Sequence, residues 1–271
     1  MLRHQLENAR IACFAKRPMK VFSGAEVRTS IITGRRSDGE VSSPLMTSDF
    51  IRFNESDRES RLRSISYSPA DPHVLTDRIG GERSDSYALL PKVGNDRIES
   101  ILSHWGESPH QLKGFVVDVD EAESQLYYRR GNDYWLSAMV DPLYDATTIK
   151  ELHFDSELHR NLAFLSVHSS LFYLYWMVYG DQFHLNKRMV RRFPAPSVET
   201  IQSHEKEIDQ KKGKLWTQVK QAFDPNVNQF KMQPVKPVLD EVDELLGEMH
   251  KLNDELVEYA KEYQEDYRMG F

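Results

Sequence analysis

The chain has 271 residues, enough for one large domain or two ordinary ones, each with its own core. Its 39% hydrophobic and 28% charged residues fit a soluble protein, and its N-terminus is too basic and interrupted by charges for a signal peptide. The single cysteine, Cys13, excludes a disulfide framework within the chain and a thiolate zinc site, so a reducing cytoplasm is the expected compartment.

The net charge of −7 is unevenly distributed. The stretch from Val235 to Phe271 holds eleven acidic and four basic residues, which leaves 31 of each sign in the rest of the chain. Residues 1–36 carry eight Lys or Arg against Glu7 and Glu26, and residues 184–194 carry four basic residues and no acid. Such patches can hold a phosphate backbone, and they are equally common as solvated faces.

Residues 1–110 are predicted to mix strands and helices. Residues 27–36 alternate and are rich in Val, Ile and Thr, which predicts a strand, and residues 9–16 form a second candidate. A turn-rich loop is expected from Gly34 to Pro44. Residues 61–69 alternate again, and the segment SYALLPKVG (86–94) leads into a helix. Its expected N-cap is Asn95, and its apolar face is formed by Ile98, Ile101 and Leu102.

Residues 111–200 are predicted to form a second domain. Strand-like segments occur at 114–120, 124–130 and 151–154, and an acidic helix start at Asp155 precedes a long apolar helix. The uncharged residues between Arg160 and Asp181 are numerous enough to span a bilayer. Because this run contains polar residues such as Asn161 and His168, we expect a helix buried inside a soluble domain, and no membrane.

The remaining residues, 201–271, are predicted to be helical. A helix opens near Ser197 and Glu199 and is interrupted by Gly213, and a proline-bearing linker follows at 226–237. A last helical stripe from Val238 to Val257 is broken by Gly247. The expected fold class is therefore α+β, with parts at 1–110, 111–200 and 201–271.

Much catalytic chemistry is missing from the sequence. The chain has no Pro-Pro pair, no FxGxG-like turn, no P-loop, no HExxH and no GxSxG. His153 and His159 are scattered, and His168 on the apolar helix is expected to be a core histidine. Asp118 and Asp120 near Lys113 would suggest a nuclease centre, but their spacing is loose and such pairs are common.

Four segments resemble the C-terminal half of large N6-adenine DNA methyltransferases of fused (type IIG-like) restriction–modification enzymes. They are AKRPMKVFSGAEVRTSIITGRR with Phe22, Gly24 and Arg28; LPKVGNDRIESIL from Leu90; LYYRRGNDYW from Leu126; and SSLFYLYWMVYGDQFHLNKRMVRRFP from Ser169. The ending KPVLDEVDELL with a final YRMG is similar to the family's last helices. The resemblance covers nearly the whole chain and begins downstream of the family's NPPY-type motif.

The resemblance implies a division of labour. Residues 1–110 would be the tail of a methyltransferase α/β domain, and residues 111–200 would be the target-recognition domain. The chain lacks the catalytic half, so it is expected to bind no cofactor and to methylate nothing alone. S-adenosylmethionine would belong to a catalytic subunit or missing N-terminal half, which becomes the expected protein partner. A split subunit, a truncated relic and a cut piece of a longer enzyme all remain open.

The residues themselves offer DNA-contacting groups. Arg129 and Arg130 provide guanidinium forks suited to base edges or phosphates, and Tyr127 and Tyr128 provide either stacking surfaces or ordinary strand packing. In the second basic segment the candidates are Asn186, Lys187, Arg188, Arg191 and Arg192. Arg188 lies one helical turn from Arg191 or Arg192, which suits successive phosphates, whereas Asn186 is equally suited to capping a helix.

Two readings of function follow. The first is sequence-specific recognition of double-stranded DNA for a methyltransferase or restriction partner. The alternative is an interaction protein that mimics or inhibits such an enzyme through its acidic C-terminal helices. A complete but divergent enzyme is disfavoured by the missing motifs.

Overall fold

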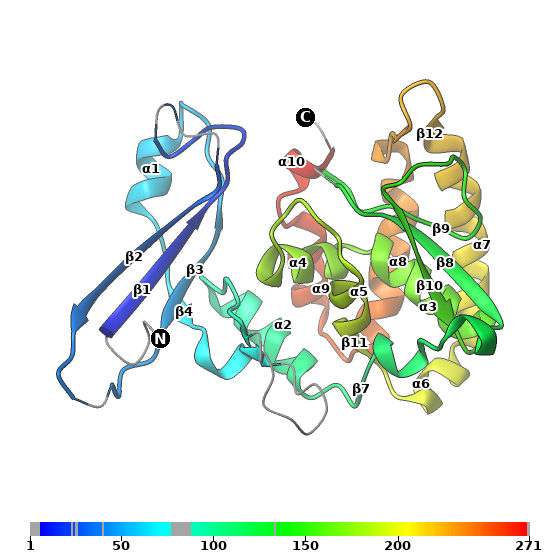
Figure 1. Ribbon diagram of the computed structural model, residues 1–271, viewed down its shortest axis with the longest axis horizontal. Helices are drawn as coiled ribbons and strands as arrows, with labels where there is room; N and C mark the ends of the chain where they lie inside the picture. The colour runs from blue at the N-terminus through cyan, green and yellow to red at the C-terminus, as the bar shows by residue number, and fades with distance from the viewer. Residues whose placement is uncertain are drawn as a thin grey trace. The chain divides into compact units, whose positions relative to one another are not determined.

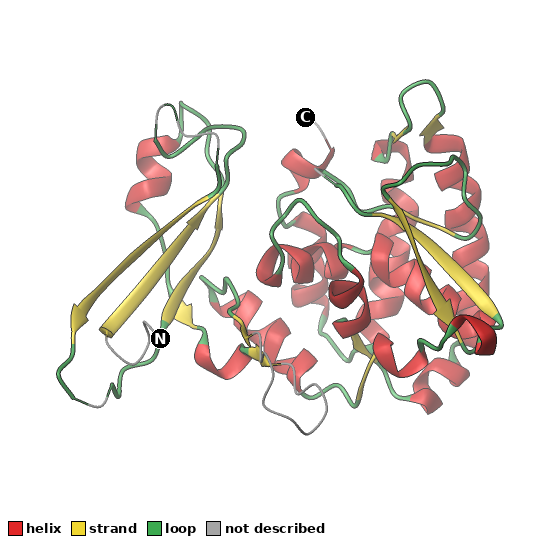
Figure 2. Ribbon diagram, in the orientation of Figure 1, coloured by secondary structure: helices red, strands yellow, loops and turns green. Residues whose placement is uncertain are grey.

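The structure is a computed structural model that describes residues 6–22, 24, 27–39, 41–76, 88–132 and 134–269. It divides into two compact units, Met1–Ser103 and His104–Phe271. Helices occur together with strands that form several small sheets, so the α+β class is confirmed (Figure 2). Several residues in the segments considered above lie outside the described residues, among them Ser23, Ala25, Glu26, Glu40, Ser86, Tyr87, Asp133 and Gly270.

The first unit contains a four-stranded sheet in the order β2-β1-β3-β4 (Figure 1). Its strands are β1 (Leu6–Phe14), β2 (Thr29–Arg36), β3 (Met46–Ile51) and β4 (Ser68–Pro69). β1 and β3 pair in parallel, and the other neighbours are antiparallel. The two strands predicted from the β-branched segments are therefore confirmed. A further short pair joins β5 (Leu75–Thr76) to β6 (Ala88–Leu89).

One face of this sheet forms a small core. Phe14, Ile51 and Phe53 are buried together, with Leu62 and Tyr67 packed against them. Of the alternating segment 61–69 only Ser68–Pro69 form a strand, whereas its first residues belong to the helix α1 (Arg58–Arg63). The apolar Leu62 and Ile65 are three residues apart, a spacing that brings side chains to one face of a helix but to opposite faces of a strand.

The helix α2 (Asp96–Gly106) forms where the sequence predicts it. The Asn95 side chain caps it by accepting hydrogen bonds from the backbone N–H groups of Arg97 at 3.1 Å and Ile98 at 3.0 Å. Ile98, Ile101 and Leu102 are buried, as expected from their spacing.

The second unit holds an antiparallel sheet in the order β10-β8-β9 (Figure 1). It consists of β8 (Ser124–Arg129), β9 (Ala138–Met139) and β10 (Ile149–Phe154), and α3 packs against all three strands. The strand expected at 114–120 is wrong: 3₁₀ turns occupy Leu112–Phe115 and Val119–Glu121, and an isolated bridge joins Val116 to Phe154. A minor ladder pairs β7 (His110–Gln111) with β11 (Pro194–Ala195).

The long apolar run forms two helices rather than the single one expected. α3 (Glu157–His168) and α4 (Ser170–Tyr179) meet at an angle of 69°. The cause is Ser169, whose extended backbone ends α3 and whose hydroxyl caps α4 by accepting from Phe172 N at 3.0 Å. Among the described residues no single helix is long and apolar enough to cross a membrane, and this bent pair meets the length and composition criteria only when taken together.

The remaining elements pack in the same unit. They are α5 (Lys187–Arg192), α6 (Val198–Ser203), α7 (Glu205–Ala222), the hairpin of β12 (Phe223–Asp224) and β13 (Gln229–Phe230), α8 (Lys236–Met249), α9 (Asp254–Glu262) and α10 (Glu265–Met269). The cap at Ser197 is confirmed. The expected interruptions at Gly213 and Gly247 are wrong, because α7 and α8 run through them.

Candidate nucleic-acid interface

The fold brings the two predicted DNA-contacting segments together. The carbonyl oxygen of Arg130 accepts a hydrogen bond from Leu185 N at 2.7 Å, and Asn132 N donates to Phe183 O at 2.9 Å. Between them Gly131 and His184 form an isolated β-bridge. The chain after β8 and the segment leading into α5 are therefore neighbours, although they are more than fifty positions apart in the sequence.

A local hydrogen-bond network fixes the turn before α5. The Asp181 carboxylate accepts from the backbone of Phe183 at 2.9 Å and of His184 at 2.6 Å, and its second oxygen lies 2.8 Å from His184 Nδ1. Partial burial alone would raise the pKa of Asp181, but the hydrogen bonds from His184 and Phe183 outweigh it and lower that pKa. The carboxylate is thus held ionised in its structural role.

The helix α5 presents three of its four basic side chains to solvent. Lys187, Arg188 and Arg191 are exposed, whereas Arg192 is 5% exposed and packs into the interior. The Asn186 side chain caps the helix, because it accepts a hydrogen bond from Met189 N at 2.9 Å. Of its two possible roles, capping and DNA contact, the structure therefore shows capping. Either Arg191 or Arg192 could lie one helical turn from Arg188. Because Arg192 is buried, Arg191 is the one of the two that reaches the surface.

On β8 the alternation of the strand separates the candidates. Tyr128 is 1% exposed, and burial raises the pKa of its hydroxyl to about 12, so its ring packs in the core rather than offering a stacking surface. Arg129 is half-buried, and its Nη1 donates to the carbonyl of Asn228 at 3.2 Å. Arg130 is exposed at the end of the strand.

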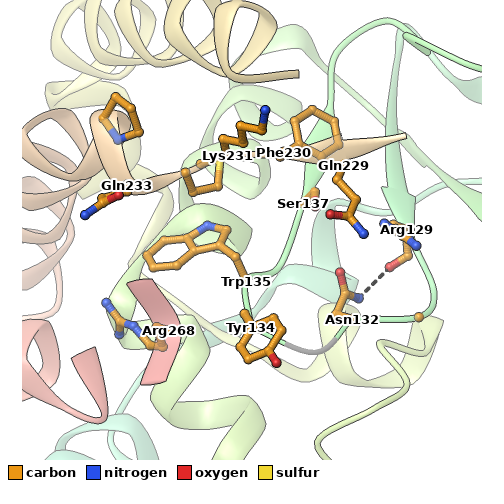
Figure 3. Close-up of a pocket in the computed structure, with 13 residues that line it drawn as sticks. Arg129, Asn132, Tyr134, Trp135, Ser137, Gln229, Phe230, Lys231, Gln233 and Arg268 are labelled. Atoms are coloured by element: carbon orange, nitrogen blue, oxygen red, sulfur yellow. Dashed lines mark hydrogen bonds between the residues drawn. The ribbon is translucent and has the colours of Figure 1, made fainter. Parts of the chain in front are cut away.

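Beside Arg129 the second unit contains a cavity of about 500 Å³, which sequence reasoning missed (Figure 3). It is lined by the end of β8, the segment up to Ser137, the β13 strand with the following turn, and α10. Its polar lining side chains are Arg129, Asn132, Ser137, Gln229, Lys231, Gln233 and Arg268. No local sequence motif predicts these lining residues, because they come from segments separated by about a hundred positions.

The other candidate groups are structural. Burial lowers the pKa of His168 to about 4, and its Nε2 lies 3.0 Å from the carbonyl oxygen of Ala138, as fits a core histidine. His159 stacks on Phe115 with ring centroids 3.9 Å apart and pairs with Asp155 at 2.6 Å. Among the described residues no group of three His, Cys, Asp or Glu side chains is placed to hold a metal ion.

Comparison with protein-family models, with curated proteins and with solved structures gives no match for this chain.

Proposed function

We propose that this protein recognises a specific sequence in double-stranded DNA, as the non-catalytic half of an adenine-specific DNA methyltransferase or restriction–modification enzyme. The observation that carries the proposal is the pairing of its two basic segments. The backbone contacts from Arg130 to Leu185 and from Asn132 to Phe183 place the Arg-Arg end of β8 next to the start of α5. One surface thus combines groups suited to base edges with groups suited to phosphates.

The phosphate-binding part of this surface is α5. At 3.6 residues per turn, Lys187, Arg188 and Arg191 fall within an arc of about 100°. The opposite arc holds the buried Met189, Val190 and Arg192. Three cations on one exposed arc match consecutive phosphates, each of which contributes sequence-independent, salt-sensitive affinity.

The base-reading part is Arg130. Its backbone is fixed on both sides, since its N–H donates to Thr148 O at 2.8 Å and its carbonyl accepts from Leu185 N. The side chain is exposed, so a hydrogen-bonded backbone at the end of the strand carries a solvent-facing guanidinium group. Such a group matches the O6 and N7 atoms of guanine in the major groove.

The partner assignment is supported by the first unit. β2 is an edge strand of its sheet, and Ile31 and Ile32 on it are 37% and 47% exposed. Exposed apolar residues on a free edge favour pairing with another chain. We assign this edge to the catalytic half, which would also supply S-adenosylmethionine and the methyl-transfer residues.

The alternative, mimicry through the acidic C-terminal helices, has weaker support. Glu241 pairs with Lys211 and Lys214, and Lys261 pairs with Glu244 and Glu258. Several carboxylates of this stretch are therefore committed to lysines of the same unit, which reduces the acidic surface left for another protein.

The proposal is tested by measuring duplex binding by fluorescence anisotropy at several salt concentrations. Replacing Lys187, Arg188 and Arg191 together with alanine should weaken binding to all duplexes alike and reduce the slope of log K against log salt by about three units. Lys206→Ala is the matched control, because Lys206 is an exposed helical lysine on α7 that belongs to neither basic segment. An unchanged slope in the triple variant would contradict the phosphate-binding role of α5.

A further inference from the structure

Three residues that line the cavity next to Arg129 also carry buried polar atoms that lack partners among the described residues. Arg268 is 3% exposed; its Nη2 donates to Ser170 Oγ at 2.9 Å, but within the described part of the chain its Nε and Nη1 have no hydrogen-bond partner. The same holds for Trp135 Nε1 and Asn132 Oδ1, both in buried side chains. These atoms have almost no accessible surface, so an occupant of the cavity would be recognised by the accessible lining groups instead.

The charge of the lining selects an anion. Three cations, Arg129, Lys231 and Arg268, line the cavity, and no carboxylate is among the described lining residues. Lys231 pairs with Asp224 at 2.9 Å at the base of the hairpin, while the Arg129 guanidinium donates to a backbone carbonyl. Among the described residues no carboxylate pairs with Arg129, and Lys231 can exchange its half-buried partner Asp224 for a phosphate.

The lining also offers flat apolar surfaces and amide groups. Trp135, Tyr134 and Phe230 contribute aromatic rings, and the Arg268 guanidinium lies 4.7 Å from the centre of the Trp135 ring. Figure 3 shows the amides of Asn132 and Gln229 pointing toward one another on the side of the cavity where Arg129 lies. Aromatic faces stack on nucleobases, and amides bond their edges. The volume of about 500 Å³ lies in the range of small-molecule sites.

We propose that this cavity binds a nucleoside monophosphate unit, with its base among the aromatic and amide groups and its phosphate at Arg129 and Lys231. The same nucleotide group can be supplied by a free mononucleotide or by a nucleotide within a single strand of DNA. The cavity is separate from the phosphate-binding face of α5, since none of Lys187, Arg188 and Arg191 lines it. Nucleotide binding here does not depend on duplex recognition.

Calorimetric titration of the full chain with each of the four deoxynucleoside 5′-monophosphates, and with a ten-nucleotide single strand, tests the inference. We expect one site per chain for at least one of these probes, and weaker binding by about tenfold in Lys231→Ala and in Gln229→Ala, both exposed hairpin positions. Lys206→Ala should bind as the unaltered chain does. Binding of a mononucleotide identifies the free source, and binding of the single strand alone identifies the strand source.

Three results would overturn the inference: no saturable heat with any probe, binding unaffected by both hairpin variants, or inorganic phosphate binding as tightly as the mononucleotides. The last would mean that the base contributes nothing. The α5 triple variant separates this inference from the proposed function. It should bind nucleotides normally while losing duplex affinity, whereas Lys231→Ala should do the reverse.

Discussion

Two glycines inside long helices predict opposite outcomes for the same substitution. Gly213 lies in α7 and Gly247 in α8. A methyl group added at Gly213 meets no atom within 4 Å outside the backbone of its own helix. Alanine is more favourable than glycine in a helix interior, so Gly213→Ala should raise the free energy of unfolding by roughly 0.5–1 kcal/mol.

At Gly247 the same methyl group collides with the neighbouring helix. It would lie 2.4 Å from Val257 Cγ2 on α9, and Val257 is itself buried and stiff at its first side-chain torsion. Ordinary carbon contacts are about 3.5–4 Å, so the α8–α9 pair must separate. Overpacking of this kind costs about 1–3 kcal/mol. After the gain in helix propensity, a net loss of about 1 kcal/mol remains at the middle of the two ranges, or about 2–4 °C in melting temperature.

Urea unfolding followed by circular dichroism measures both variants. Val257→Ala removes the colliding methyl groups, so it should cost less in the Gly247→Ala background than in the unaltered chain, and this difference is the coupling between the two positions. The reasoning is refuted if Gly213→Ala and Gly247→Ala shift stability in the same direction, or if the cycle shows no coupling.

Three further outcomes are expected. Burial lowers the pKa of His168 and His250 to about 4, so their contribution to stability is complete above pH 6.5 and is lost as the pH falls to about 4. His250→Leu should therefore reduce the dependence of melting temperature on pH between these two values. An unchanged dependence would contradict this expectation. Calorimetry should detect no saturable S-adenosylmethionine binding to this chain, whereas stoichiometric micromolar binding would place a cofactor site here. If β2 pairs with another chain, Ile32→Lys should reduce self-association measured by sedimentation velocity. An unaltered distribution of monomers and oligomers would contradict pairing through the β2 edge.

Local signals in the sequence were sufficient for several elements. The caps at Asn95 and Ser197 follow from short polar side chains placed just before apolar periodicity, and their hydrogen bonds lie within the same few residues, whereas at Asn186 the sequence left capping and DNA contact equally open. The alternation in SQLYYRR likewise places Leu126 and Tyr128 on the buried side. That alternation was the signal that could have separated the buried Tyr128 from the half-buried Tyr127 and Arg129.

Other features depend on packing between distant segments. Gly247 resembles a helix break in the sequence, but it permits the close approach of Val257 from the next helix. The direction of Arg192 depends on which arc of α5 faces the interior. The cavity beside Arg129 could not be predicted, because Arg268 reaches it from the last helix and Gln229 from a hairpin that the sequence presents as a linker.

The most direct test of sequence-specific DNA recognition is selection of bound duplexes from a random pool, followed by sequencing. The unaltered chain, alone or with its catalytic partner, should enrich one defined sequence, and Arg130→Ala should relax preference at a single position at a cost of about 1–3 kcal/mol on the selected site. A pool that remains random after repeated rounds, with or without the partner, would contradict the account.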